Sequence, residues 1–237
     1  MNFFEKVLKK TGIIKDAPHT KYLKTSFSQS GEDLIIKYIF DILGIYKPSF
    51  IDIGAHHPFY LNNTYLFYVN GSRGVNIEPD SDLFKEFILS RKLDTNLNFG
   101  IGAENEDLDF YLMSASTLNT FSKKEAESIE AENLYKIKEI KKIPVKTINN
   151  VINLYCNNVF PDLLSLDAEG VDEIIIKSIF TEGFKPKIIC IETITYSEIG
   201  RGQKQLNLID YIKSNGYLLY ADTNINSIFV LKEIWER

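Results

Sequence analysis

The 237-residue sequence lacks most of the features that would place a chain outside the ordinary globular class. It has only two cysteines, Cys156 and Cys190, which excludes a disulfide framework and a thiolate zinc site. Its net charge of −5 is unlike the basic surface of nucleic-acid-binding proteins. No apolar run reaches the roughly 20 residues of a membrane-spanning helix, and the first residues lack the apolar core and cleavage site of a signal peptide. We therefore expect a cytoplasmic protein with no nucleic-acid partner and no membrane span.

The amino-acid composition of the chain is that of one globular domain. The chain is 44% hydrophobic and 25% charged, which is typical of a domain with a continuous core. The amino terminus mixes apolar residues and lysines at helical spacing, so residues 1–25 are predicted to form a helical extension. This extension would pack on the domain, with a weak membrane or partner contact as the alternative. The main domain is then expected over residues 26–237, and a homo-oligomer is compatible with it.

Short apolar runs alternate with helix-like segments along most of the chain. This order predicts an α/β protein with a mostly parallel, seven-stranded sheet covered on both faces. The strands expected in the parallel part are 50–54, 74–78, 96–102, 163–167 and 187–192. The runs 217–221 and 227–231 lie too close together for a crossover helix, so they must form an antiparallel hairpin at the carboxyl end. Edge strands near 108–112 and 143–145 and a charged helix over 122–137 are expected as an insertion.

Polar residues follow the first two predicted strands, where ligands bind in parallel sheets. Asp52 and Gly54 end the first strand, and Glu78 ends the second. The glycine permits a tight turn under a ligand, and the carboxylate can accept both hydroxyl protons of a ribose. His56 and Pro58 stand where a dinucleotide site needs glycines, which favours a nucleoside ligand without a pyrophosphate. An aspartate that only caps the turn is the alternative for Asp52.

Four separated blocks resemble one known family. They are 27–33 (FSQSGED), 50–55 (FIDIGA), 74–79 (GVNIEP) and 164–170 (LSLDAEG). Together they resemble the FkbM family of methyltransferases over about residues 26–231. The resemblance implies a class I methyltransferase fold, which is Rossmann-like, over residues 26–237. It also implies S-adenosylmethionine as the cofactor and O-methylation of an acceptor, often a hydroxyl of a sugar or glycan.

The resemblance also implies roles for single residues. By matching position, Asp52 organises the first turn and the methionine amino group, and Glu78 holds the ribose. Ile101 and Gly102 border the adenine.

Further residues are candidates for cofactor contact: Gln29, Gly54, His56, Asn63 and Asp167. Gln29 has a structural alternative, because Ser30 and Asp33 have the spacing of a helix capping pair. Asn63 has one too, since it and Thr64 precede a predicted helix and are good capping residues.

Methyl transfer to a hydroxyl requires alignment of the acceptor oxygen with the donor methyl and removal of a proton. The candidates for the base are His57, Asp167 and Glu169. His57 is our preferred base if no metal takes part, because a neutral imidazole is poised near neutral pH. Its alternative is a histidine bonded to backbone and locked before Pro58. Metal dependence is possible but not favoured, and a divalent cation would use Asp167, Glu169 and Glu192 as oxygen ligands.

Two other functions share parts of this pattern. A nicotinamide-dependent oxidoreductase has the same sheet and a carboxylate like Glu78, but it needs a glycine turn suited to phosphate. A catalytically silent protein that binds an adenosine cofactor shares every feature except turnover. Cofactor binding distinguishes the first from a methyltransferase, and turnover distinguishes the second.

Overall fold

The computed structural model describes residues 18–168, 170–195 and 202–237. A seven-stranded sheet with the order β3-β2-β1-β7-β8-β10-β9 forms its centre. The strands are β1 (Phe50–Ile53), β2 (Gly74–Ile77), β3 (Thr95–Leu97), β7 (Leu163–Leu166), β8 (Ile188–Glu192), β9 (Tyr217–Asp222) and β10 (Asn226–Leu231). β10 runs antiparallel to both of its neighbours, and the other pairs are parallel. The predicted fold class is confirmed, including the antiparallel hairpin at the carboxyl end.

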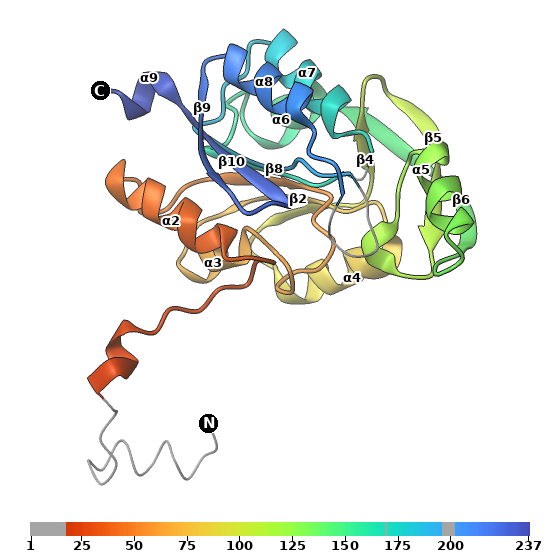
Figure 1. The fold of residues 1–237 in the computed structure, drawn as a ribbon, viewed down its shortest axis with the longest axis horizontal. Helices are drawn as coiled ribbons and strands as arrows, with labels where there is room; N and C mark the ends of the chain where they lie inside the picture. The colour runs from red at the N-terminus through yellow and green to blue at the C-terminus, as the bar shows by residue number, and fades with distance from the viewer. Residues whose placement is uncertain (1–17, 169, 196–201) are drawn as a thin grey trace, which may run out of the picture.

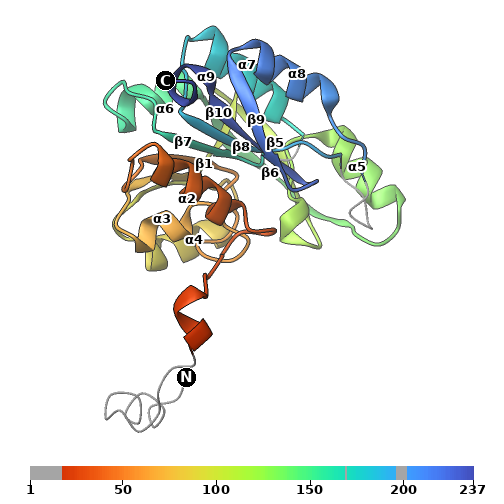
Figure 2. The ribbon, with the colours of Figure 1, turned by 60° about the vertical axis from the view of Figure 1, so that its left-hand side comes forward.

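Helices cover both faces of this sheet (Figure 1). One face carries α2 (Glu32–Ile42), α3 (Tyr65–Val69) and α4 (Ser81–Ser90), and the other carries α6 (Ile148–Tyr155), α7 (Asp172–Thr181) and α8 (Leu206–Ser214). Figure 2 shows the same layers from another side, with the short α9 (Lys232–Trp235) at the end of the chain directly after β10. None of the helices in the described ranges is long and apolar enough to cross a membrane.

The strands at the centre are buried on both faces. Ile51 and Ile53 of β1 pack into the cluster formed with α6, α7 and α8, whereas Phe50 packs with residues of α2. A strand covered by helices on both sides needs apolar residues at every position. This is why these strands are mostly apolar in the sequence, with one buried polar residue each in β1, β2 and β7, and why their positions were predictable.

An insertion between β3 and α6 builds a second sheet with the order β4-β6-β5. It consists of β4 (Gly100–Gly102), β5 (Glu106–Met113), the 3-10 helix η2 (Ser116–Leu118), α5 (Lys123–Ala131) and β6 (Ile137–Thr147). The predicted single strand over 96–102 is wrong, because β3 belongs to the main sheet and β4 to the second one. The chain changes sheets at Asn98, whose side-chain amide donates to the carbonyls of Glu78 and Pro79 at 2.8 and 3.0 Å.

Two further predictions for the insertion need correction. The helix expected over 122–137 ends at Ala131, since Asn133 has a φ of 62° and Ile137 already begins β6. β6 is also much longer than the expected edge strand at 143–145, and it is the central strand of its sheet. The register shows how it accommodates Pro144, because β4 pairs only with the residues from Val145 onward.

The start of α2 also differs from the prediction. Gly31, with a φ of 90°, precedes the helix and has no side chain to cap it, and the Ser28 hydroxyl accepts from the Asp33 amide of the first turn at 3.3 Å. The carboxylate of Asp33 instead accepts hydrogen bonds from the Ser26 hydroxyl at 2.6 Å and the Phe27 amide at 2.7 Å. The Ser30–Asp33 capping pair is therefore wrong, and Asp33 ties the segment before the helix to its first turn.

The predicted extension over residues 1–25 falls mostly outside the described residues, which begin at 18. Its described part contains a 3-10 helix, η1 (Pro18–Tyr22), which projects from the body of the molecule (Figures 1 and 2).

We predict that Gly54→Ala lowers the free energy of unfolding by about 3 kcal/mol or more, as measured by urea denaturation. Gly54 has a φ of 71°, and a Cβ built there would lie 1.8 Å from the carbonyl oxygen of Asp167. Relief of this overlap would require β1 and β7 to separate at their ends. Gly44→Ala is the matched control, because Gly44 has the same φ of 71° but no atom within 4 Å of a built Cβ. Equal losses in the two variants would show that the close contact is unimportant.

Candidate active site

Four residues form a row at the carboxyl edge of the main sheet. Each of them directly follows the last residue of a strand that has a partner in the parallel part of the sheet. Glu78 follows β2 in this way, Gly54 follows β1, Asp167 follows β7 and Glu192 follows the paired part of β8. In neighbouring parallel strands, residues at matching positions of the register lie side by side. The row therefore holds three carboxyl groups, with the glycine leaving open space between Glu78 and the other two.

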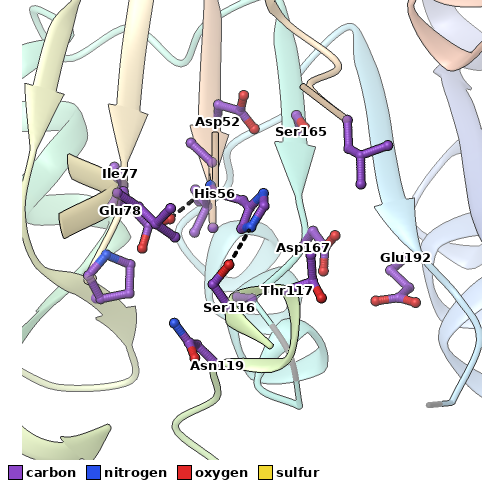
Figure 3. A pocket seen from close by; sticks show the side chains of 18 of the residues that line it. Asp52, His56, Ile77, Glu78, Ser116, Thr117, Asn119, Ser165, Asp167 and Glu192 are labelled. Carbon is purple, nitrogen blue, oxygen red and sulfur yellow. Dashed lines mark hydrogen bonds between the residues drawn. The ribbon is translucent and has the colours of Figure 1, made fainter. Parts of the chain in front are cut away.

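A pocket of about 360 Å³ opens above this row (Figure 3). One end is apolar and is lined by Leu83, Phe99, Ile101, Phe110 and Phe121. The insertion adds polar side chains from Ser116, Thr117 and Asn119, and Thr195 follows β8. No lysine or arginine is among the described residues that line the pocket, so its charged groups are carboxyls and one histidine, His56.

Most residues predicted to contact a cofactor line this pocket. They are Gln29, Asp52, Gly54, His56, Asn63, Glu78, Ile101 and Asp167. Gly102 does not, because it lies in β4 with its neighbour Thr147 of β6 and is buried. The pocket brings these segments together, and their contact with a ligand stays a prediction.

Glu78 is buried and fixed by two backbone amides. Its Oε2 accepts from the His56 amide at 2.8 Å, and its Oε1 accepts from the Asp80 amide at 2.7 Å. Burial outweighs these two hydrogen bonds and raises the pKa of Glu78 to about 8. A ligand hydroxyl would thus meet a carboxyl group whose orientation is already set.

Asp52 is a buried residue of the pocket lining, and it holds the turn after β1. Its carboxylate accepts from the Thr64 hydroxyl at 2.8 Å and the Asn62 amide at 3.1 Å. Burial raises its pKa, and hydrogen bonds from Ser165 and Thr64 act in the opposite direction. The other end of the Asn62 side chain accepts from the Thr64 and Tyr65 amides at 3.0 and 2.8 Å. Asn62 therefore links Asp52 to the start of α3.

Sequence analysis named Asn63 and Thr64 as residues that could cap the next helix, but it did not name Asn62, and the structure gives each of the three a different contact. Asn62 supplies the hydrogen bonds that begin α3, and Thr64 adds no side-chain cap to the helix. Asn63 instead donates to the Ser165 hydroxyl at 3.3 Å and lines the pocket. An asparagine two or three residues before a helix is a recognisable signal that pointed to this region but not to Asn62 itself.

Sequence analysis also missed Arg91, a fully buried arginine behind the turn. It is paired with the buried Asp94 at 2.8 Å and donates to the Pro58 carbonyl at 3.0 Å and the Thr64 hydroxyl at 3.1 Å. Its guanidinium also lies 4.6 Å from the centre of the Tyr68 ring. Arg91 thus joins α4, α3 and the turn after β1. No local pattern indicated this role of Arg91, because Pro58 and Thr64, which it joins to α4, are remote from it in sequence.

His57, the preferred base, does not line the pocket. Its Nδ1 accepts from the Tyr60 amide at 3.1 Å and is 3.4 Å from that of Phe59, which matches the backbone-bonded alternative. His56 takes the pocket position instead. Its φ is 53°, and its Nε2 lies 3.3 Å from the Ser116 hydroxyl (Figure 3). The position of His57 therefore gives no support to its choice as the base.

Asp167 and Glu192 stand side by side at the ends of β7 and β8 (Figure 3). Asp167 is exposed to the pocket, and Glu192 is half-buried. Desolvation inside the pocket raises the pKa of both groups, and the charge of Asp167 raises that of Glu192 further.

The candidate metal ligands Asp167, Glu169 and Glu192 are only partly covered by the structure, because Glu169 lies outside the described residues. Among the residues that are described, no three histidine, cysteine, aspartate or glutamate side chains are grouped so that they could hold a metal ion.

Comparison with known proteins identifies a domain family. The family model described as Methyltransferase FkbM domain matches residues 52–219. Among curated proteins, none is significantly similar in sequence to this chain.

Solved structures with similar folds include the TehB-like SAM-dependent methyltransferase from Corynebacterium glutamicum, which is 10% identical with a TM-score of 0.43. That match covers 96% of this chain and 97% of the other. A Staphylococcus aureus protein named for caffeoyl-CoA O-methyltransferase activity is 14% identical with a TM-score of 0.42, and the match covers 97% and 93% of the two chains. Values this low carry no inference about activity.

The raised pKa of Glu78 predicts a pH-dependent stability difference between the wild-type protein and Glu78→Gln. Since the pKa rises from 4.5 to about 8 on folding, the folded state holds a proton that the unfolded state releases between these values. The stability that this proton provides is present below about pH 4.5 and is lost as the pH rises through about 8. Glutamine cannot ionise, so Glu78→Gln should gain stability relative to the wild type over this range in thermal unfolding scans.

Glu86→Gln is the control, because it removes an exposed carboxylate of α4 that does not line the pocket. A difference between Glu78→Gln and the wild type that does not change with pH would mean that Glu78 has an ordinary pKa.

Proposed function

Because the chain belongs to the FkbM methyltransferase family and is an S-adenosylmethionine-dependent methyltransferase, we propose that it methylates a hydroxyl oxygen of a sugar or glycan. One observation carries this proposal: a single row of strand ends aligns Glu78 with the Asp167–Glu192 pair in one pocket. The carboxyl group of Glu78 is suited to binding ribose hydroxyls, and the Asp167–Glu192 pair is suited to removing a proton from the acceptor. All three groups lie in a pocket with no lysine or arginine among its described lining residues.

The pocket lining is compatible with S-adenosylmethionine. The apolar end, with Phe99 and Ile101, suits the adenine ring, and Glu78 suits the ribose hydroxyls. A pocket of about 360 Å³ is within the usual range for a small-molecule site. The cofactor carries a positive sulfonium, and the neighbouring carboxyl groups would stabilise that charge. When bound, it would supply an electrophilic methyl group.

The acceptor end of the pocket suits an uncharged molecule rich in hydroxyl groups. Gln29 and Asn63 provide amides that both donate and accept, and Thr195 provides a hydroxyl. Sugar hydroxyls have the same double character. The absence of lysine and arginine from the described lining argues against a phosphorylated or carboxylated acceptor. A cytoplasmic location is part of this proposal.

Asp167 is the base in our proposal. It is exposed to the pocket, whereas the imidazole of His57 is occupied by backbone amides outside it. Asp167 would take the proton of the acceptor hydroxyl as its oxygen is methylated. The cofactor, when bound, would supply the methyl group and keep the electron pair of the carbon–sulfur bond. Alignment of the cofactor and the acceptor in one pocket contributes the rest of the rate enhancement.

The two rival functions account less well for the pocket. A nicotinamide dinucleotide needs donors for its pyrophosphate, and the turn after β1 carries His56 and Pro58 with no described lysine or arginine in the lining. A catalytically silent binding protein has no need for a carboxyl pair exposed beside the cofactor end.

We predict that Glu78→Ala weakens binding of S-adenosylmethionine by about tenfold to a hundredfold in titration calorimetry. Leaving the buried ribose hydroxyls without this hydrogen-bond partner costs about 1–3 kcal/mol, which covers this range. Glu86→Ala, which removes an exposed carboxylate of α4, is the control and should bind as the wild type does. NAD should not bind to either protein. Unchanged affinity in Glu78→Ala would contradict the assignment of the ribose to this residue.

Asp167→Asn should lower turnover by about a hundredfold or more, because a positioned base typically contributes about 10²–10⁴-fold. Turnover is measured as transfer of labelled methyl from S-adenosylmethionine to neutral mono- and oligosaccharides, with sugar phosphates as the comparison set. His57→Ala is the paired variant and should stay active. The reverse result, an active Asp167→Asn and an inactive His57→Ala, would return the role of base to the histidine.

A further inference from the structure

The insertion contributes one wall of the pocket through four consecutive residues, 116–119. All four line the pocket, and they include the 3-10 helix η2. We propose that this η2 segment (residues 116–119) closes over the ribose end of bound S-adenosylmethionine. Ser116 and Asn119 are then positioning residues, whose hydrogen bonds to the main domain hold the segment closed before the cofactor arrives. This inference rests on the part of the proposed function that places the ribose at Glu78, and it is independent of the acceptor.

Two hydrogen bonds between described residues tie the η2 segment to the main domain. The Ser116 hydroxyl lies 3.3 Å from Nε2 of His56, and Figure 3 shows these two side chains pointing toward each other. The side-chain amide of Asn119 donates to the carboxylate of Asp80 at 2.9 Å. His56 belongs to the turn after β1, and Asp80 directly precedes α4. The segment is therefore attached to the main domain at two separate points.

The two partners of the η2 segment are also the residues that hold Glu78. The His56 amide donates to Oε2 of Glu78 at 2.8 Å, and the Asp80 amide donates to Oε1 at 2.7 Å. Each of the two residues thus binds the Glu78 carboxyl group with its backbone and the η2 segment with its side chain. A ribose bound at Glu78 would therefore meet a segment that is anchored at the same residues that orient this carboxyl group.

The base of the η2 segment is held inside the insertion. Tyr111 and Thr120 exchange two backbone hydrogen bonds at 2.9 and 3.2 Å. The Met113 amide donates to Oδ1 of Asn119 at 2.8 Å. Loss of the two bonds to the main domain would free the segment and leave this base folded. A free segment must be ordered again when the cofactor binds, so the two bonds strengthen binding by removing that cost.

Binding of S-adenosylmethionine to the double variant Ser116→Ala/Asn119→Asp tests the inference. Aspartate at position 119 keeps the oxygen that accepts from Met113, but it replaces the donor to Asp80 with a second negative oxygen. We expect about tenfold weaker affinity than the wild type in titration calorimetry, with most of the change in the release rate in stopped-flow measurements. The added negative charge would by itself favour the cationic cofactor, so weaker binding reflects the lost hydrogen bonds. Wild-type affinity and release rate would overturn the inference.

Ser114→Ala is the matched control. The Ser114 hydroxyl accepts from the Lys136 amide at 3.1 Å, so this variant loses a hydrogen bond within the insertion and outside the pocket lining. It should bind the cofactor as the wild type does. Ser116→Thr keeps the hydroxyl and should retain wild-type affinity, whereas Ser116→Ala alone should lose about threefold. Equal losses in Ser114→Ala and the double variant would contradict a specific role for Ser116 and Asn119.

The same two substitutions in a Glu78→Ala background separate closure of the segment from an effect on Glu78 alone. If the η2 segment closes over the cofactor, the substitutions should weaken binding by a similar factor in both backgrounds. No further loss in the Glu78→Ala background would mean that Ser116 and Asn119 act only through Glu78, and the closing role would be wrong.

Hydrogen exchange gives a readout that needs no turnover. S-adenosylmethionine should slow amide exchange both in the η2 segment and around Glu78, and the double variant should lose the slowing in the segment. Slowing around Glu78 alone would overturn the inference and leave the proposed cofactor site intact. Slowing at neither place would mean that the cofactor does not bind at Glu78, so the proposed cofactor site would fail and the inference with it.

Discussion

The close approach of Gly54 to the carbonyl of Asp167 is the constraint on which the site depends. With no side chain at Gly54, the end of β1 can lie directly against the end of β7. Glu78 and Glu192 then fall on either side in the same row. A larger residue at this position would separate the strands and disperse the carboxyl groups. The chemistry of the pocket therefore depends on backbone packing as much as on its functional side chains.

Below this row, buried polar groups keep the first turn in one conformation. Asp52 has no ion-pair partner in direct contact, yet its carboxylate receives hydrogen bonds from Asn62 and Thr64. Arg91 reaches the same threonine from α4 and is itself neutralised by Asp94. Buried polar groups are costly when unsatisfied, so such a network stabilises one arrangement over its alternatives. The pocket floor is thus pre-formed before any ligand arrives.

The sequence predicted what depends on local pattern and missed what depends on remote contacts. Buried parallel strands are mostly apolar, and Glu78 and Asp167 directly follow such strands, so the sheet and the pocket edge could be located. The change of sheet at Asn98 depends on carbonyls twenty residues away, and the role of Arg91 depends on residues even farther off. The pocket position expected for His57 was wrong for a similar reason. The left-handed backbone of His56 directs one ring into the pocket, and the next ring is held outside it.

The row of strand ends has a consequence for how the protein is made. Its first two members are complete when residue 78 has been synthesised, but Asp167 and Glu192 follow about ninety to over a hundred residues later. β1 stands between β2 and β7, so one of its edges stays unpaired until that late part of the chain emerges. Contacts of such long sequence separation form slowly. During synthesis, β1 therefore has an unpaired and apolar edge. We expect chaperones to bind nascent molecules in this state.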